Sequence, residues 1–267
     1  MGFFSPRLVD LEVAEWQFEY FEWLISNFSS APGLPDSELW LPTPEHFPAR
    51  EDVEIYRPTL AEHIFFLVKE KCGFNEGTIF DLVRVETNSP QLLEGGASVQ
   101  VEGTTACGTY QIKPQKYGQP IETISYDKGM EKNPEQLVAT FAHELGHALH
   151  NRSTEPVDID AELYELFTDL TAVYLGFGIF LANSRFGFSS NSIGWQAKGA
   201  GYLPEADIVF ATALFMKIKN IPQDVAIEHL KPRLKKVLKK AFKQLLGYEE
   251  EIEVLRTLNP QSPSSKS

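Results

Sequence analysis

The sequence predicts an α+β fold in which a small twisted sheet is combined with a larger set of helices. Apolar residues recur at helical spacing in long segments near both ends of the 267-residue chain. Residues 78–127 are instead rich in Val, Ile, Thr and Tyr with glycines between the runs, which is typical of short strands. Hydrophobic residues make up 43% of the chain, which suffices for a substantial core and excludes disorder as its general state.

The N-terminal region is expected to be helical and acidic. Apolar residues repeat every three or four positions in residues 8–28, and acidic residues occupy much of the remaining surface. A proline-rich stretch follows, and helical spacing resumes in residues 59–72. We therefore expect an N-terminal helical layer in residues 1–75, a main domain in residues 76–256 and a disordered tail in residues 257–267.

The main domain is expected to begin with strands and to continue with helices. Four segments have the composition of strands: 78–86, 97–102, 106–113 and 121–127. The helices that follow are expected at 134–150, from Asp158 or Asp160 to about Ala182, at 204–219, and from Pro232 to near Gly247. The sequence thus predicts a small sheet followed by C-terminal helices.

Charge is unevenly distributed along the chain. The net charge of −13 excludes a protein that binds nucleic acid through an overall basic surplus. Residues 217–243, however, carry nine Lys or Arg against two acidic residues. The lysine-rich helix could bind an anionic membrane or nucleic acid, or it could pack by its apolar face with its lysines in solvent or facing the acidic residues 8–28. We favour packing, because lysine-rich solvent faces are ordinary, and we expect no nucleic-acid partner.

Several features favour a cytoplasmic protein without a membrane span. The first residues lack the basic and apolar regions of a secretory signal. The longest charge-free apolar run, residues 170–182, is shorter than the ~20 residues that span a bilayer and is expected to form a buried helix. Cys72 and Cys107 are too few for a disulfide framework, which favours a reducing compartment, and Cys107 is interpreted as a core residue of a strand.

The predicted helix 134–150 contains the motif HExxH, formed by His143, Glu144 and His147. In a chain with six histidines this motif is expected about 0.014 times by chance. Residues four apart share a helix face, so the two histidines can bind one ion at ~2.0–2.1 Å while Glu144 lies beside that face. Gly146 lowers helix propensity by ~1 kcal/mol relative to Ala, and therefore predicts the close approach of another backbone.

A catalytic zinc site needs a third protein ligand and an open position. Glu162, Glu165 and Asp169 form a stripe on the next helix, where buried carboxylates need a positive partner. Glu165 has an acid four residues further on, so we favour Glu165 as the ligand and Asp169 as the acceptor for the outer N–H of a ligating histidine. Glu162, Asp158 and Asp160 remain alternative ligands.

Two histidine patterns do not complete the site. His150 lies too close to both motif histidines on the same helix to close a tetrahedron with them, and it is interpreted as a C-terminal histidine that offsets the helix dipole. A metzincin would have its third histidine at position 153, which is serine in this chain. The metzincin pattern is therefore excluded.

The motif residues resemble those of the gluzincin metallopeptidases typified by thermolysin, in which Glu-x-x-x-Asp on the next helix completes HExxH. The match covers the three motif residues, Glu165 and Asp169, with 17 residues between His147 and Glu165. The resemblance implies a zincin-like domain, zinc held by His143, His147 and Glu165, Glu144 as general base, and Asp169 as partner of the first histidine. It also implies an upstream strand, 121–127 or 106–113, that pairs with an extended substrate.

The predicted activity is hydrolysis of peptide bonds in a peptide or protein substrate. Zinc lowers the pKa of bound water from about 15.7 to about 7, and Glu144 accepts the proton as the hydroxide attacks a polarised carbonyl. Tyr202, Tyr174 and His229 are candidates for stabilising the oxyanion, and Tyr202 is preferred. The alternative is a non-catalytic regulatory or interaction protein that keeps zinc for stability or sensing. A base at position 144 argues against this alternative, because structural zinc does not need one.

Overall fold

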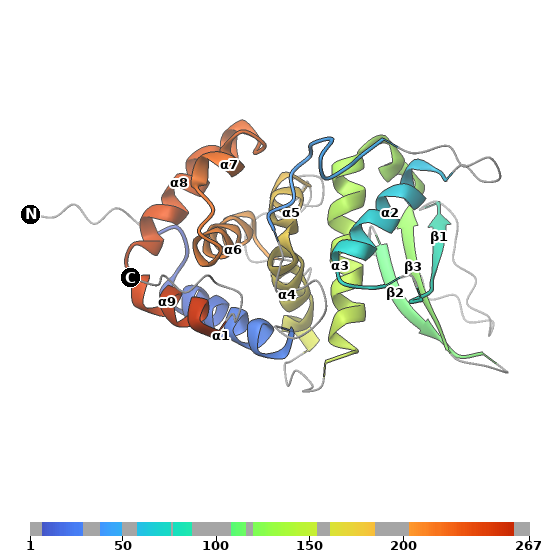
Figure 1. Cartoon of the computed structure of the whole chain (residues 1–267), viewed down its shortest axis with the longest axis horizontal. Helices are drawn as coiled ribbons and strands as arrows, with labels where there is room; N and C mark the ends of the chain where they lie inside the picture. The colour runs from blue at the N-terminus through green and yellow to red at the C-terminus, as the bar shows by residue number, and fades with distance from the viewer. Residues whose placement is uncertain are drawn as a thin grey trace, which may run out of the picture.

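One three-stranded sheet lies at one end of the molecule, and helices build the remainder (Figure 1). The computed structural model describes residues 7–28, 38–49, 58–75, 77–86, 108–115, 120–153, 161–184 and 203–258. Helix α3 (Pro134–His150) packs on the sheet on one side and on α4 and α5 on the other. This mixture of helices with a small sheet agrees with the predicted α+β class.

The described strands form a mixed sheet in the order β1-β3-β2. Strand β1 (Phe80–Val85) is parallel to the central strand β3 (Ile121–Asp127), and β2 (Gly108–Lys113) is antiparallel to it. The short 3-10 helix η1 (Lys128–Lys132) leads from β3 to α3. Three of the four predicted strands are therefore confirmed, and the fourth, at 97–102, lies outside the described residues.

Helix α3 has the predicted bounds and contacts both the sheet and helix α2 (Leu60–Lys71), which packs beside it. It begins with Pro134, which is favoured at a first helical position because its missing N–H would be unpaired in any case. The ring of Phe141 lies 5.6 Å from the ring of Tyr126 on β3 and 5.2 Å from that of Phe65 on α2. These aromatic contacts fix the orientation of the HExxH helix against the sheet.

The segment after α3 contains two helices that meet at a kink in a π-helical turn, where Gly176 has non-helical dihedral angles. It consists of α4 (Ala161–Ala172), the turn η2 (Val173–Phe177) and α5 (Gly178–Ser184). The segment Leu163–Ser184 is long and apolar enough to cross a membrane, with a mean hydropathy of 1.4, but 89% of its apolar window is buried inside the protein. It is a core helix, as its charge-free run predicts.

The kink lies where another segment crosses the helix at Gly176. This glycine has a φ of +99°, and a Cβ atom added there would lie 2.1 Å from the carbonyl oxygen of Glu38. The backbone N–H of Trp40 donates a hydrogen bond to the carbonyl oxygen of Gly176 at 3.0 Å. A side chain at this position would therefore conflict with both the backbone conformation and the crossing segment.

The C-terminal helices pack as a group around α6 (Glu205–Ile218). Both α6 and α8 (Pro232–Leu245) confirm the helices expected to start at Pro204 and Pro232. Two further helices, α7 (Gln223–Ile227) and α9 (Glu249–Leu258), are absent from the sequence-based expectations. The three glutamates that open α9 are favourable at a helix N-terminus, and they are the signal that identifies it.

The two N-terminal helices do not form the single layer that the sequence suggests. Helix α1 (Leu11–Phe28) packs on α4 and α9, whereas α2 packs on α3 beside the sheet (Figure 1). Both helices are amphipathic, but hydrophobic periodicity only shows that a helix has an apolar face. It does not show which element covers that face.

Helix α8 docks by its apolar face. Its side chains at four helically spaced positions are buried, namely Leu234, Leu238, Ala241 and Leu245. Gln244 accepts a hydrogen bond from the backbone N–H of Leu8 at 2.7 Å and so joins α8 to the segment before α1. Within the described residues, no ion pair connects the lysines of α8 to the acidic residues of α1.

Asn183, at the end of α5, ties the long helical run to its neighbours. Its Nδ2 atom donates to Oε2 of Glu135 in α3 at 3.2 Å and to the carbonyl oxygen of His229 at 2.9 Å. Its Oδ1 atom accepts the backbone N–H of Lys231 at 3.0 Å. Because Asn183 is 2% exposed, these bonds supply partners that its amide would otherwise lack.

We expect Gly176→Ala to lower the free energy of unfolding by about 3 kcal/mol or more, because it combines left-handed strain with overlap on Glu38. Gly247→Ala is the matched control, since the nearest heavy atom to its added Cβ is 3.5 Å away. Chemical denaturation of both variants measures the difference. Equal stabilities would contradict the role assigned to Gly176.

Candidate metal centre

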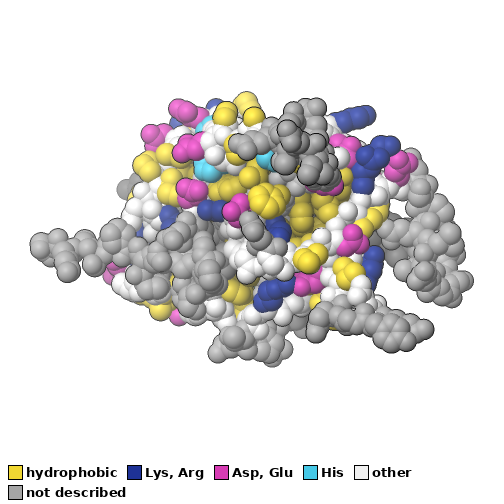
Figure 2. Space-filling model, turned by 45° about the vertical axis from the view of Figure 1, so that its right-hand side comes forward, with side chains coloured by type: hydrophobic (Ala, Val, Ile, Leu, Met, Phe, Trp, Pro, Cys, Tyr) yellow, Lys and Arg dark blue, Asp and Glu magenta, His cyan; other side chains and the backbone are white. Residues whose placement is uncertain are grey.

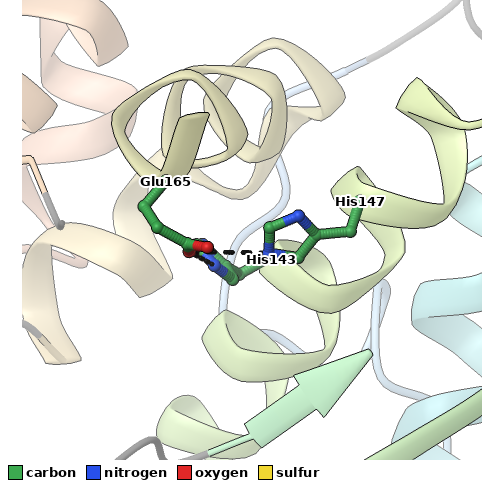
Figure 3. Close-up of side chains that lie close together, drawn as sticks. All are labelled: His143, His147 and Glu165. Carbon is green, nitrogen blue, oxygen red and sulfur yellow. Dashed lines mark hydrogen bonds and ion pairs between the residues drawn. The ribbon is translucent and has the colours of Figure 1, made fainter. Parts of the chain in front are cut away.

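Two helices bring three ligand-type side chains together. His143 and His147 come from α3 and Glu165 from α4, and the three point toward one another (Figure 3). One ligand atom from each residue lies within 4.8 Å of the others. The Oε2 atom of Glu165 is 3.0 Å from Nε2 of His143 and 3.5 Å from Nε2 of His147. This cluster could hold a metal ion.

The helices approach closely at Gly146, one residue before the second histidine. A Cβ atom on Gly146 would lie 3.0 Å from Cγ2 of Thr168 and 3.4 Å from its carbonyl oxygen. The close backbone approach predicted from this glycine therefore occurs, and the neighbouring backbone is that of α4. The absence of a side chain lets α4 come close enough to place Glu165 between the two histidines.

His143 is held between two carboxylates in a buried position. Its Nδ1 atom lies 2.9 Å from Oδ1 of Asp169, and a carboxylate can only accept, so the histidine donates. The other oxygen of Asp169 accepts the backbone N–H of Leu203 at 2.9 Å. Burial lowers the pKa of His143, but hydrogen bonds with Asp169 and Glu165 outweigh it and raise the pKa to about 10.

The same contacts act on the carboxylate of Glu165. Burial raises its pKa, but hydrogen bonds and charge interactions with His143 and His147 outweigh that effect and hold it well below the ordinary value. The cluster therefore contains a carboxylate that is stabilised by neighbouring positive charge. A cation bound by the same nitrogen and oxygen atoms could supply that charge instead.

His147 is oriented by contacts of a different kind. Its Nδ1 atom is 3.3 Å from the hydroxyl oxygen of Thr168. The rings of Tyr110, from β2, and Tyr164, from α4, stack on the imidazole with centroid distances of 6.4 and 5.4 Å. Tyr110 is itself held by a hydrogen bond of 2.8 Å from its hydroxyl to Glu122. These contacts leave Nε2 as the nitrogen that faces Glu165.

Glu144 lies beside the cluster without joining it. Its side chain is buried, and burial raises the pKa of its carboxyl group although His143 and His147 oppose the shift. No hydrogen-bond donor is bonded to this carboxylate within the described part of the chain. A Cβ atom on Gly108 of β2 would lie 2.8 Å from its Oε1 atom, so the first residue of β2 lies against it. A buried carboxylate without a donor retains the basicity that proton transfer needs.

His150 does not have the role that its position in the sequence suggests. It is the last residue of α3 but is buried, and burial together with the charges of His147 and His143 lowers its pKa to about 3. A neutral imidazole carries no charge to offset the helix dipole, so that interpretation is wrong. Its Nε2 atom instead lies 2.7 Å from the hydroxyl oxygen of Thr171 and 3.3 Å from that of Tyr20.

Of the remaining site candidates, the structure describes Tyr174 and His229, and neither belongs to the cluster. Tyr174 is buried with its ring 6.3 Å from that of Phe21, and burial raises its pKa. His229 accepts the hydrogen bond from Asn183 through its carbonyl oxygen. The preferred oxyanion residue Tyr202 lies outside the described residues, as do Asp158, Asp160, Cys107 and the side chain of Glu162.

Three residues at the centre were missed by sequence reasoning: Thr168, Tyr164 and Tyr110. Tyr164 and Thr168 lie four residues apart on α4, on either side of Glu165, so helical spacing places them on one face near the ligand. The position of Tyr110 in the sequence gives no such signal, because only the strand order and register bring it to His147.

We expect Asp169→Asn to weaken binding of Zn²⁺ by ~10–100-fold, as is typical when the partner of a ligating histidine is lost. The asparagine has one oxygen, whereas Asp169 accepts from both His143 and Leu203. Competition with a chelator measures the affinity, and Asp81→Asn, at an exposed position of β1, is the control. If the Asp169→Asn variant binds Zn²⁺ with wild-type affinity, Asp169 has only a structural role.

Comparison of the chain with known protein families, curated proteins and solved structures finds no match. What stands is a cluster of two histidines and one glutamate that could hold a metal ion, supported by Asp169 and accompanied by Glu144.

Proposed function

We propose that this chain is a zinc-dependent peptidase related to the gluzincins. The observation that carries the proposal is the convergence of His143, His147 and Glu165 within 4.8 Å, with the carboxylate of Glu144 beside them on the same helix. The cluster could bind the metal, and Glu144 could act as the general base. Both parts are needed for hydrolysis by an activated water.

The donor set fits zinc. Two imidazole nitrogens and one carboxylate oxygen form an N,N,O set that leaves room for a fourth ligand, as in catalytic zinc sites. Both histidines have a partner at Nδ1, which leaves their Nε2 atoms for the metal. Zinc bound there supplies Lewis-acid chemistry, in that it acidifies water and polarises a carbonyl group.

Glu144 is the residue proposed to move the proton. It accepts a proton from the attacking water and returns it to the leaving amine, which requires a carboxylate with a raised pKa. Burial provides this raised pKa. The buried base also favours an enzyme over a non-catalytic zinc protein, because a metal kept for stability or sensing has no use for it.

The substrate is proposed to be a peptide that pairs with strand β2. Of the two strands implied by the resemblance, β3 has a neighbour on each edge and cannot accept another chain. Strand β2 is paired on one edge only within the described sheet, and its first residue, Gly108, lies against Glu144. An extended peptide added to this edge would run past the base. We further propose that the protein acts in the cytoplasm.

We expect Glu144→Gln to keep the fold and the zinc but to lower hydrolysis of a mixed peptide library by about 100-fold or more. Glu165→Ala should instead lose zinc affinity, because it removes a ligand oxygen. Elemental analysis and peptide digestion with mass spectrometry measure the two effects separately. Glu162→Ala, on the same helix as Glu165, is the control and should retain both zinc binding and hydrolysis.

Two results would contradict these roles. Wild-type hydrolysis by the Glu144→Gln variant would remove Glu144 as the base. Release of zinc by Glu162→Ala but not by Glu165→Ala would show that Glu162, and not Glu165, is the third ligand.

No nucleic-acid or membrane partner is part of the proposal, and the lysines of α8 provide the test. Replacement of Lys235, Lys236, Lys239 and Lys240 by Gln should leave hydrolysis nearly intact. It should change stability only modestly, since screened surface ion pairs contribute about 0–1 kcal/mol each. Binding to DNA, RNA and anionic vesicles is measured at low and high salt. Tight binding that falls with salt and disappears in the variant would add such a partner.

A further inference from the structure

We propose that Thr168 is a positioning residue of the candidate metal centre, in that its hydroxyl oxygen accepts a hydrogen bond from the N–H at Nδ1 of His147 and so reserves Nε2 for a metal. The inference rests on the proposed metal-binding function. It assigns a role to a residue that belongs neither to HExxH nor to the Glu-x-x-x-Asp pair.

The geometry places Thr168 between the two helices of the site. The residue is fully buried, and its Oγ1 atom lies 3.3 Å from Nδ1 of His147. The same hydroxyl donates a hydrogen bond to the carbonyl oxygen of Tyr164, one turn earlier on α4, at 2.9 Å. Its methyl group faces Gly146, with Cγ2 3.0 Å from the position of an added Cβ atom.

The direction of the bond to His147 follows from counting protons. A threonine hydroxyl has one proton, and a carbonyl oxygen can only accept, so this proton is used by Tyr164. Toward His147 the hydroxyl therefore presents a lone pair, and Nδ1 must carry the hydrogen. With a hydrogen kept on Nδ1, Nε2, which faces Glu165 at 3.5 Å, is the nitrogen that can offer a lone pair to a metal in place of its contact with Glu165.

The two histidines are thus supported unequally. His143 donates to the charged carboxylate of Asp169, whereas His147 donates to a neutral hydroxyl. A charged acceptor gives the stronger hydrogen bond and makes the histidine a more basic ligand. Loss of Thr168 should therefore weaken metal binding less than loss of Asp169.

The test replaces the hydroxyl while keeping the shape of the side chain. Thr168→Val puts a methyl group in place of the hydroxyl and retains the contact with Gly146, whereas Thr168→Ser restores an acceptor. Thr171→Val is the matched control: Thr171 also bonds its own helix carbonyl, at Phe167, but contacts His150 instead of a ligand. Long-range ¹⁵N–¹H NMR of the histidine side chains reports which nitrogen carries the proton, and chelator competition measures the affinity for Zn²⁺.

The wild-type protein without metal should show the His147 proton on Nδ1. Thr168→Val should shift the proton toward Nε2 and weaken zinc binding by ~10-fold, the lower end of such effects. Thr168→Ser should restore both properties, and Thr171→Val should leave His147 and the zinc affinity unchanged.

Three results would overturn the assignment. Protonation of wild-type His147 at Nε2 alone would contradict it. This measurement needs no variant, so it tests the assignment even if Thr168→Val fails to fold. An unchanged tautomer and affinity in Thr168→Val contradict it as well. Equal loss in Thr171→Val would show a general effect of disturbing α4. The NMR result does not depend on zinc or activity, so failure of the proposed peptidase function is distinguished from failure of this assignment.

Discussion

The centre depends on the contact between α3 and α4 at Gly146. Every other candidate feature requires that these helices lie close enough for a glutamate on one to reach two histidines on the other. A Cβ atom at position 146 would lie 3.0 Å from Cγ2 of Thr168, so the contact between the helices would have to give by a few tenths of an ångström. Protein interiors are densely packed, so a small change in separation moves a carboxylate out of reach of the nitrogens. Helix packing therefore determines whether these residues form a site.

Electrostatics adds a second constraint. Asp169 is 2% exposed, and a buried carboxylate is costly unless it is paired. Its two oxygens accept from His143 and from the backbone of Leu203 just before α6. The same residue thus orients a ligand-type histidine and anchors the entry to the C-terminal helices. Loss of this carboxylate affects the centre and the packing together, so a variant must be checked for both.

The sequence was informative wherever the pattern is local. HExxH predicts a shared helix face because helical periodicity alone brings His143 and His147 together. The Glu-x-x-x-Asp spacing similarly placed Asp169 on the face that meets His143. Sequence reasoning was less successful where tertiary contacts decide. The burial that makes His150 neutral depends on Tyr20 of α1, and the stacking of Tyr110 on His147 depends on strand order. Neither follows from residue spacing.

The bonds of Asn183 have a consequence for motion in the centre. Helix α3 and the long run α4–α5 are joined near the ligands by His143 and Asp169, and again near the start of α3 by Glu135 and Asn183. Two helices fastened at two separated points cannot slide along each other or rotate without breaking one of the bonds. Movement of α3 against α4 or against α5 would therefore break one of these bonds. Preorganisation of this kind keeps ligand atoms in place before anything binds, which lowers the entropy cost of binding.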